Sequence, residues 1–115
     1  MKARAGNLKK FPCPYLKGEV ELEDAREQHI AERHPELLPA HLARIEQTLA
    51  DPDPIRRSGR FASARLFSRW FDDLLGGKHV VVVVLCSTAS HGRNWIITAY
   101  IARSIAVGDV EWKRS

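Results

Sequence analysis

The densest group of chemically useful side chains lies between residues 29 and 35. His29 and Arg33 are four residues apart and share one face of a helix, and His34 comes last before Pro35 ends that helix. Histidine titrates near neutral pH, so it is suited to remove the proton of a ribose 2′-hydroxyl when RNA is cut without a metal. A plainer interpretation stays open, because a histidine at a helix C-terminus often only caps the helix, and one beside Ile30 is often a core residue.

A second candidate group lies in the apolar segment near the C-terminus. Thr98 and Tyr100 are two residues apart, so they share one face of a strand, with Asn94 and Ile96 ahead of them. We expect the alternate residues to face the helices: Trp95, Ile97, Ala99 and Ile101. A hydroxyl beside a phenol can orient a phosphate or donate a proton, although both residue types are also common in strands for packing alone.

Arginines dominate the middle of the chain. Five of them lie in a stretch without any acidic residue: Arg56, Arg57, Arg60, Arg65 and Arg69. The whole chain has 18 Lys and Arg against 14 Asp and Glu, a net charge of +4, which favours a polyanionic partner. Because the guanidinium fork binds phosphates well, we predict that nucleic acid is contacted by Arg56, Arg57, Arg60 and Arg65. The alternative is a solvated strand edge protected by charge.

Metal and cofactor chemistry find little support in the sequence. The histidines His29, His34 and His41 lack the i, i+4 spacing of a helical zinc pair, and neither cysteine is near them. No serine lies in a GxSxG motif, and no glycine run has the spacing of a phosphate-binding loop. We therefore expect no metal and no cofactor.

The cysteines and the apolar runs bear on the compartment. Cys13 and Cys86 lie far apart and form no CxxC pair, so two free thiols in a reducing compartment are expected. The basic N-terminus is not followed by an apolar signal segment, and the longest apolar run, residues 80–86, is too short to cross a bilayer. These features predict a cytoplasmic protein without membrane contact.

The chain of 115 residues is long enough for one hydrophobic core. Residues 1–18 are predicted to be a basic N-terminal arm, and residues 19–115 a single domain. Helices are expected over residues 24–34 and from Pro39 until Asp51 and Pro52, and strands over 19–22, 55–58, 64–71, 79–86, 94–103 and 110–112. The valine-rich strand 79–86 must be central and buried on both faces. Helices followed by strands predict an α+β fold with an antiparallel sheet and the helices on one face.

The order and spacing of several short motifs resemble a known family. The motifs are His29-Ile30-x-x-Arg33-His34-Pro35-Glu36-Leu37, the run from Ile45 to Arg56, Leu66-Phe67-Ser68-Arg69, the valine strand and Ile97-Thr98-Ala99-Tyr100. Over residues 19 to 112 this series resembles the phage-associated nuclease-like domains grouped with barnase, EndoU, the tRNA-cutting colicins and RelE. The resemblance implies two N-terminal helices packed on a four-stranded antiparallel sheet, and RNA cleavage that needs no metal.

The resemblance also implies a catalytic group, which comprises His29, Arg33, His34, Arg69, Thr98 and Tyr100. His34 or His29 would remove the 2′-hydroxyl proton, and Arg69 with Arg33 would stabilise the charge of the transition state. Tyr100 or Thr98 would orient the phosphate or assist the leaving oxygen, and the product would be a 2′,3′-cyclic phosphate. RNA is the expected partner, and a cognate inhibitor or a fused or phage-encoded protein is a further candidate. Two alternatives stay open: a non-catalytic nucleic-acid-binding module, and a phage-related domain whose basic face binds an acidic protein.

Overall fold

Strand β5 (Lys78–Cys86), rich in valine, runs through the middle of the sheet. In this computed structural model, which describes residues 8–58, 63–87, 92–105 and 110–113, β5 pairs antiparallel with β4 (Ala64–Phe71) on one side and with β6 (Asn94–Ala102) on the other. Val82 and Val84 are fully buried, which confirms the prediction of a central strand. β-branched side chains suit this position because they pack well on both faces of a pleated sheet.

The sheet is larger than predicted. It has seven strands in the order β1-β2-β6-β5-β4-β3-β7, and β2 (Gly18–Glu23) runs parallel to β6. On the far side β3 (Pro54–Arg57) pairs antiparallel with both β4 and β7 (Val110–Lys113). The predicted four-stranded antiparallel sheet is therefore wrong: the sheet is mixed, and β3 to β6 are only its middle. Additional strands on both sides cover edges that a four-stranded sheet would leave with unpaired backbone groups.

The segment predicted to be an N-terminal arm contributes to the sheet from residue 8 onward. Strand β1 (Leu8–Cys13) pairs antiparallel with β2, and the 3-10 turn η1 (Pro14–Leu16) joins the two strands. Phe11 and Cys13 are buried, while Lys9 and Lys10, which precede them in the strand, are not. Prolines and lysines obscured this alternation in the sequence, although a proline such as Pro12 is tolerated in a strand at the edge of a sheet.

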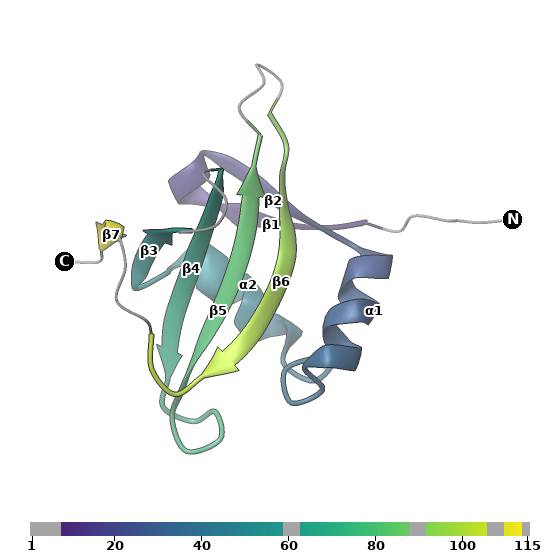
Figure 1. The fold of residues 1–115 in the computed structure, drawn as a ribbon, viewed down its shortest axis with the longest axis vertical. Coiled ribbons are helices and arrows are strands. Elements are labelled where there is room, and N and C mark those ends of the chain that lie inside the picture. The colour runs from purple at the N-terminus through teal and green to yellow at the C-terminus, as the bar shows by residue number, and fades with distance from the viewer. Residues whose placement is uncertain (1–7, 59–62, 88–91, 106–109, 114–115) are drawn as a thin grey trace, which may run out of the picture.

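Both helices form where the sequence predicted them. Helix α1 (Asp24–Arg33) buries Ile30, and α2 (Leu42–Ala50) buries Ile45 and Leu49, which are four residues apart and share one apolar face of the helix. Helix α2 packs behind β4 and β5, and α1 stands beside β6 (Figure 1). Within the described residues, neither helix is long and apolar enough to cross a membrane.

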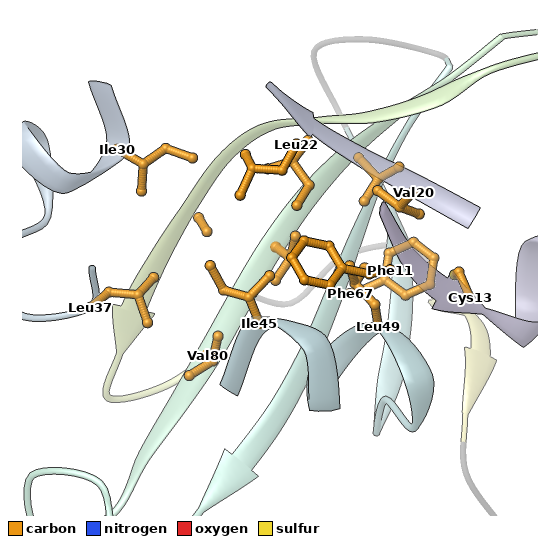
Figure 2. Packing of buried hydrophobic residues seen from close by; sticks show 14 of the residues in the cluster. Phe11, Cys13, Val20, Leu22, Ile30, Leu37, Ile45, Leu49, Phe67 and Val80 are labelled. Atoms are coloured by element: carbon orange, nitrogen blue, oxygen red, sulfur yellow. The ribbon is translucent and has the colours of Figure 1, made fainter. Parts of the chain in front are cut away.

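The hydrophobic core lies between α2 and the sheet. Figure 2 shows Ile45 and Leu49 of α2 pointing toward Phe67 of β4 and Phe11 of β1. Val80 of β5 and Ile30 of α1 extend the same cluster toward the side where α1 lies. Burial of these large side chains contributes roughly 1.5–3 kcal/mol each to the free energy of folding before the entropic costs. The helices therefore pack on one face of the sheet.

Glu111 connects the C-terminal strand β7 to the rest of the sheet. Its carboxylate accepts hydrogen bonds from the hydroxyl of Tyr15 at 2.5 Å, from Nε of Arg57 at 3.0 Å and from Nε of Arg65 at 2.9 Å. Burial raises the pKa of the Glu111 carboxyl, but these hydrogen bonds outweigh burial and lower the pKa below its usual value. Burial, together with the hydrogen bond to Glu111, raises the pKa of Tyr15 to about 12. The elements η1, β3, β4 and β7 thus meet at one carboxylate.

Removing this carboxylate should destabilise the fold measurably. We predict that Glu111→Ala lowers the free energy of unfolding by about 2 kcal/mol, because it leaves Tyr15 and Arg65 without their shared acceptor in a half-buried place. Urea denaturation at pH 7 measures the loss. Glu46→Ala, at an exposed position of α2, serves as the control and should change the midpoint little. Equal midpoints for the two variants would show that the carboxylate does not hold β7.

Candidate functional site

An irregularity in β6 decides which of its side chains face the core. Val83 pairs with Thr98, but Val84 pairs with Ile96, so Ile97 is an extra residue on the β6 side of the ladder. Such a bulge reverses the alternation of side chains on either side of it. Ile96 is consequently buried in the core and Trp95 lies on the opposite face, so the predicted assignment of these two residues was wrong.

Thr98 and Tyr100 lie on the face of the sheet turned away from α2, as predicted. Tyr100 pairs with Val81, whereas Val80 and Val82 on either side of it belong to the core cluster. We call this side of β3 to β6 the outer face. Its polar and aromatic side chains are Arg56, Ser68, Trp70, His79, Trp95, Thr98 and Tyr100. Arg56 and Ser68 are buried there, Trp70 is exposed, and the other four are half-buried.

His34 meets Tyr100 beside strand β6. Residue 34 ends α1, where its backbone N–H donates to the carbonyl of Ile30. The ring centroids of His34 and Tyr100 are 6.1 Å apart, with the ring planes tilted by 40°. His34 Nδ1 also lies 3.6 Å from a carboxylate oxygen of Glu36, and 31% of the His34 side chain is exposed. Two residues that the sequence singled out independently are thus brought together, and both can be reached from solvent.

The other candidates on α1 are not part of this contact. His29 and Arg33 are both exposed on the helix. Within the part of the chain that the structure describes, the ring contact with β6 comes from His34 and not from His29. The geometry therefore favours His34 of the two histidines that the sequence left as alternatives.

Arg69 lies on the opposite face from Tyr100. It pairs with Val80, a core residue, and its guanidinium donates to Oδ2 of Asp51 at 2.9 Å and lies 5.5 Å from the centre of the Phe71 ring. The predicted grouping of Arg69 with Thr98 and Tyr100 is therefore not formed. Arg69 shares its side of β4 with the core residue Phe67, and the sequence alone did not reveal that this side faces the helices.

The predicted phosphate-binding arginines separate into different environments. Arg57 and Arg65 both donate to Glu111, and Arg60 lies outside the described residues. Arg56 alone of the described members lies on the outer face, with only 6% of its surface exposed. Burial lowers the pKa of its guanidinium, and the nearby Tyr100 acts in the opposite direction. Arginine stays protonated under such conditions, so a positive charge sits just beneath this face.

His79 is a residue that the sequence analysis did not single out. On the outer face it pairs with Trp70, and the two rings make an edge contact with centroids 4.9 Å apart. Its buried Nδ1 has no hydrogen-bond partner among the described residues. Burial lowers the pKa of the imidazole, Asp53 opposes this change, and Arg56 adds to it. His79 is two residues before Val81, the partner of Tyr100, and residues two apart in a strand share a face. This spacing is the signal in the sequence that could have identified His79.

No relative was found in which this site could be compared. Comparison with models of protein families, with curated proteins and with solved structures finds no match. The resemblance to nuclease-like domains stays a prediction. Over the described ranges, no three histidine, cysteine or carboxylate side chains are grouped so that they could hold a metal ion.

The lowered pKa of His79 makes stability depend on pH. Below its ordinary pKa of 6.5 the unfolded chain binds a proton that the folded chain resists, so the free energy of unfolding should fall as pH drops from 7 toward 5. His79→Phe keeps a ring against Trp70 and should flatten this decrease. Urea denaturation of both proteins at pH 8 and at pH 5.5 measures the difference, with pH 8 as the reference because the imidazole is neutral there. An identical decrease in both proteins would contradict the prediction.

Proposed function

We propose that this protein is a metal-independent endoribonuclease with its site on the outer face beside β6. The observation that carries the proposal is the contact between the imidazole of His34 and the phenol of Tyr100. RNA cleavage by its own 2′-hydroxyl needs one group that removes a proton and another that supplies one. An imidazole and a phenol, both open to solvent and side by side, can perform these two roles.

The proposed reaction is a displacement at phosphorus. His34 removes the proton of the 2′-hydroxyl, and the 2′-oxygen attacks the neighbouring phosphorus. The bond from phosphorus to the 5′-oxygen breaks, and Tyr100 supplies a proton to that leaving oxygen while Thr98 orients the phosphate. The products are a 2′,3′-cyclic phosphate and a free 5′-hydroxyl, and no metal takes part.

Arg56 supplies the positive charge that the resemblance assigned to Arg69. Arg69 is held by Asp51 on the other face, whereas Arg56 shares a face with Tyr100; burial lowers the pKa of the Arg56 guanidinium, and Tyr100 opposes this change. A fixed cation in a poorly solvated place stabilises developing negative charge more than an exposed one does. Because Arg56 is only 6% exposed, it acts through its field rather than by gripping a phosphate.

Two exposed arginines flank the pair of His34 and Tyr100. Arg33 precedes His34 on α1, and Arg103 follows the end of β6. Neither forms an ion pair with another described residue, which distinguishes both from Arg57 and Arg69. We propose that they contact the phosphates on either side of the cut, and that a cognate inhibitor or another acidic protein competes for the same cations.

The cleavage proposal predicts a specific pattern of activity. Purified protein should cut single-stranded RNA in excess EDTA and spare DNA, which lacks the attacking 2′-hydroxyl. His34→Ala should lower the cleavage rate by on the order of a hundredfold, as expected when a general acid or base is removed. His29→Ala, on the same helix but outside the contact, should cut as the wild type does. Tight RNA binding by the wild type without any cleavage would support the non-catalytic binding module instead.

Salt dependence should identify the phosphate contacts. Affinity for an uncleavable 2′-deoxy single strand should fall linearly with salt on a log–log scale. Replacing Arg33 and Arg103 together with alanine should reduce that slope by about 1.4, or about 0.7 per lost phosphate contact. Arg57→Ala, which removes a side chain 62% exposed but bound to Glu111, should leave the slope as in the wild type. A smaller slope for Arg57→Ala, with the slope of the double variant unchanged, would show that the phosphate contacts lie on the opposite face.

A further inference from the structure

We infer that Trp70 is a stacking platform for a base of single-stranded RNA next to the proposed cleavage site, an inference that rests on the proposed RNA function of the outer face. Trp70 lies on this face with 41% of its surface exposed. Single exposed hydrophobic residues are common and mean little by themselves. What distinguishes Trp70 is the set of neighbours that hold it in place.

The indole is held from several sides. Its Nε1 donates to Oδ1 of Asp72, and the backbone N–H of Trp70 donates to Oδ2 of Asp53 at 3.3 Å. His79 supports one part of the ring through the edge contact at 4.9 Å. Gly77 lies so close that a Cβ there would come within 2.6 Å of the indole atom Cζ2, and its φ of +101° also favours glycine. A ring fixed in advance loses little conformational freedom when a ligand stacks on it.

The position of Trp70 relative to the proposed site fits a neighbouring nucleotide. Trp70 pairs with His79, and His79 is the diagonal neighbour of Tyr100 on the next strand, roughly 7–8 Å away between Cα atoms. Tyr100 in turn contacts His34 at the edge of β6. The rings of Trp70, His79, Tyr100 and His34 therefore form a row that crosses the outer face from β4 to α1.

The chemistry of this row matches a single-stranded nucleic acid. Every base has a flat face that stacks on an aromatic side chain, and only in a single strand is that face free. The positive charge of Arg56 beneath the same face and the exposed Arg103 beyond β6 complement the phosphates that link such bases. An aromatic surface supported by cations is the arrangement that binds single strands with little dependence on sequence.

Trp112 provides a matched control for this inference. It is exposed to nearly the same extent, 38%, but it pairs with the core residue Ile55 and its ring packs against Tyr15 at 6.1 Å. It therefore lies on the side of the sheet opposite to Trp70. Its ring packs the C-terminal strand β7 against η1, whereas the ring of Trp70 contacts Asp72 and His79 within its own hairpin of β4 and β5.

The test measures binding with an uncleavable 2′-deoxy oligonucleotide of uniform sequence and with an abasic strand of the same length and charge. Trp70→Ala should weaken binding of the base-containing strand by on the order of tenfold or more, and Trp70→Phe should recover part of the loss. Binding of the abasic strand should be equal for the wild type and Trp70→Ala. Trp112→Ala should bind both strands as the wild type does.

These measurements separate the inference from the proposed cleavage, because neither strand can be cut. The inference is overturned if Trp70→Ala binds the base-containing strand as the wild type does, if it loses as much affinity for the abasic strand, or if the wild type binds neither strand. RNA cleavage that is unaffected by Trp70→Ala would leave the proposed nuclease intact and remove the stacking site. Base-dependent binding through Trp70 by a protein that cuts no RNA would support the stacking site and contradict the proposed nuclease.

Discussion

The burial of strand β5 on both faces is the constraint on which the rest of the structure depends. Val80 and Val82 fill the space under the helices, and Val81 between them is buried on the outer face. A strand in this position needs hydrogen-bonded neighbours on both sides, and β4 and β6 provide them over almost its whole length. His79 lies at the start of this strand, directly before the valines, and adds an ionisable group to the outer face.

The proposed site arises where regular pairing ends. Within the described residues, the backbone ladder between β2 and β6 pairs only Glu21 with Trp95, and β2 then leads directly into α1, so the helix rather than a strand lies along the remaining edge of β6. The C-terminus of α1 therefore reaches the edge of the outer face and brings His34 to Tyr100. Because the bulge at Ile97 comes before Thr98, both Thr98 and Tyr100 keep their side chains on that face.

Charge in this protein serves two different purposes. Arg57 and Arg65 attach β7 through Glu111, and Arg69 attaches the end of α2 to β4 through Asp51, so these cations contribute to the fold. The pair of Arg65 and Glu111 is the most enclosed of them, with 22% and 17% of the two side chains exposed, and removal of one partner of such a pair costs free energy. The cations nearest the proposed site lie elsewhere: Arg56 is buried under the outer face, and Arg33 and Arg103 are exposed beside His34 and after the end of β6. A positive net charge therefore indicated a polyanionic partner without locating its binding surface.

The sequence by itself determined the local elements, because periodicity and turn residues act over a few residues. It located α1, α2, the central valine strand and the face shared by Thr98 and Tyr100, and it left His29 and His34 as alternatives, between which the contact with Tyr100 decides. It did not determine that Leu8–Cys13 is a strand, that the sheet is mixed, or that Arg69 faces α2, because these depend on pairing between distant segments. The bulge at Ile97 and the meeting of Trp70 with His79 were likewise decided by tertiary structure, since register between neighbouring strands leaves no mark in either strand alone.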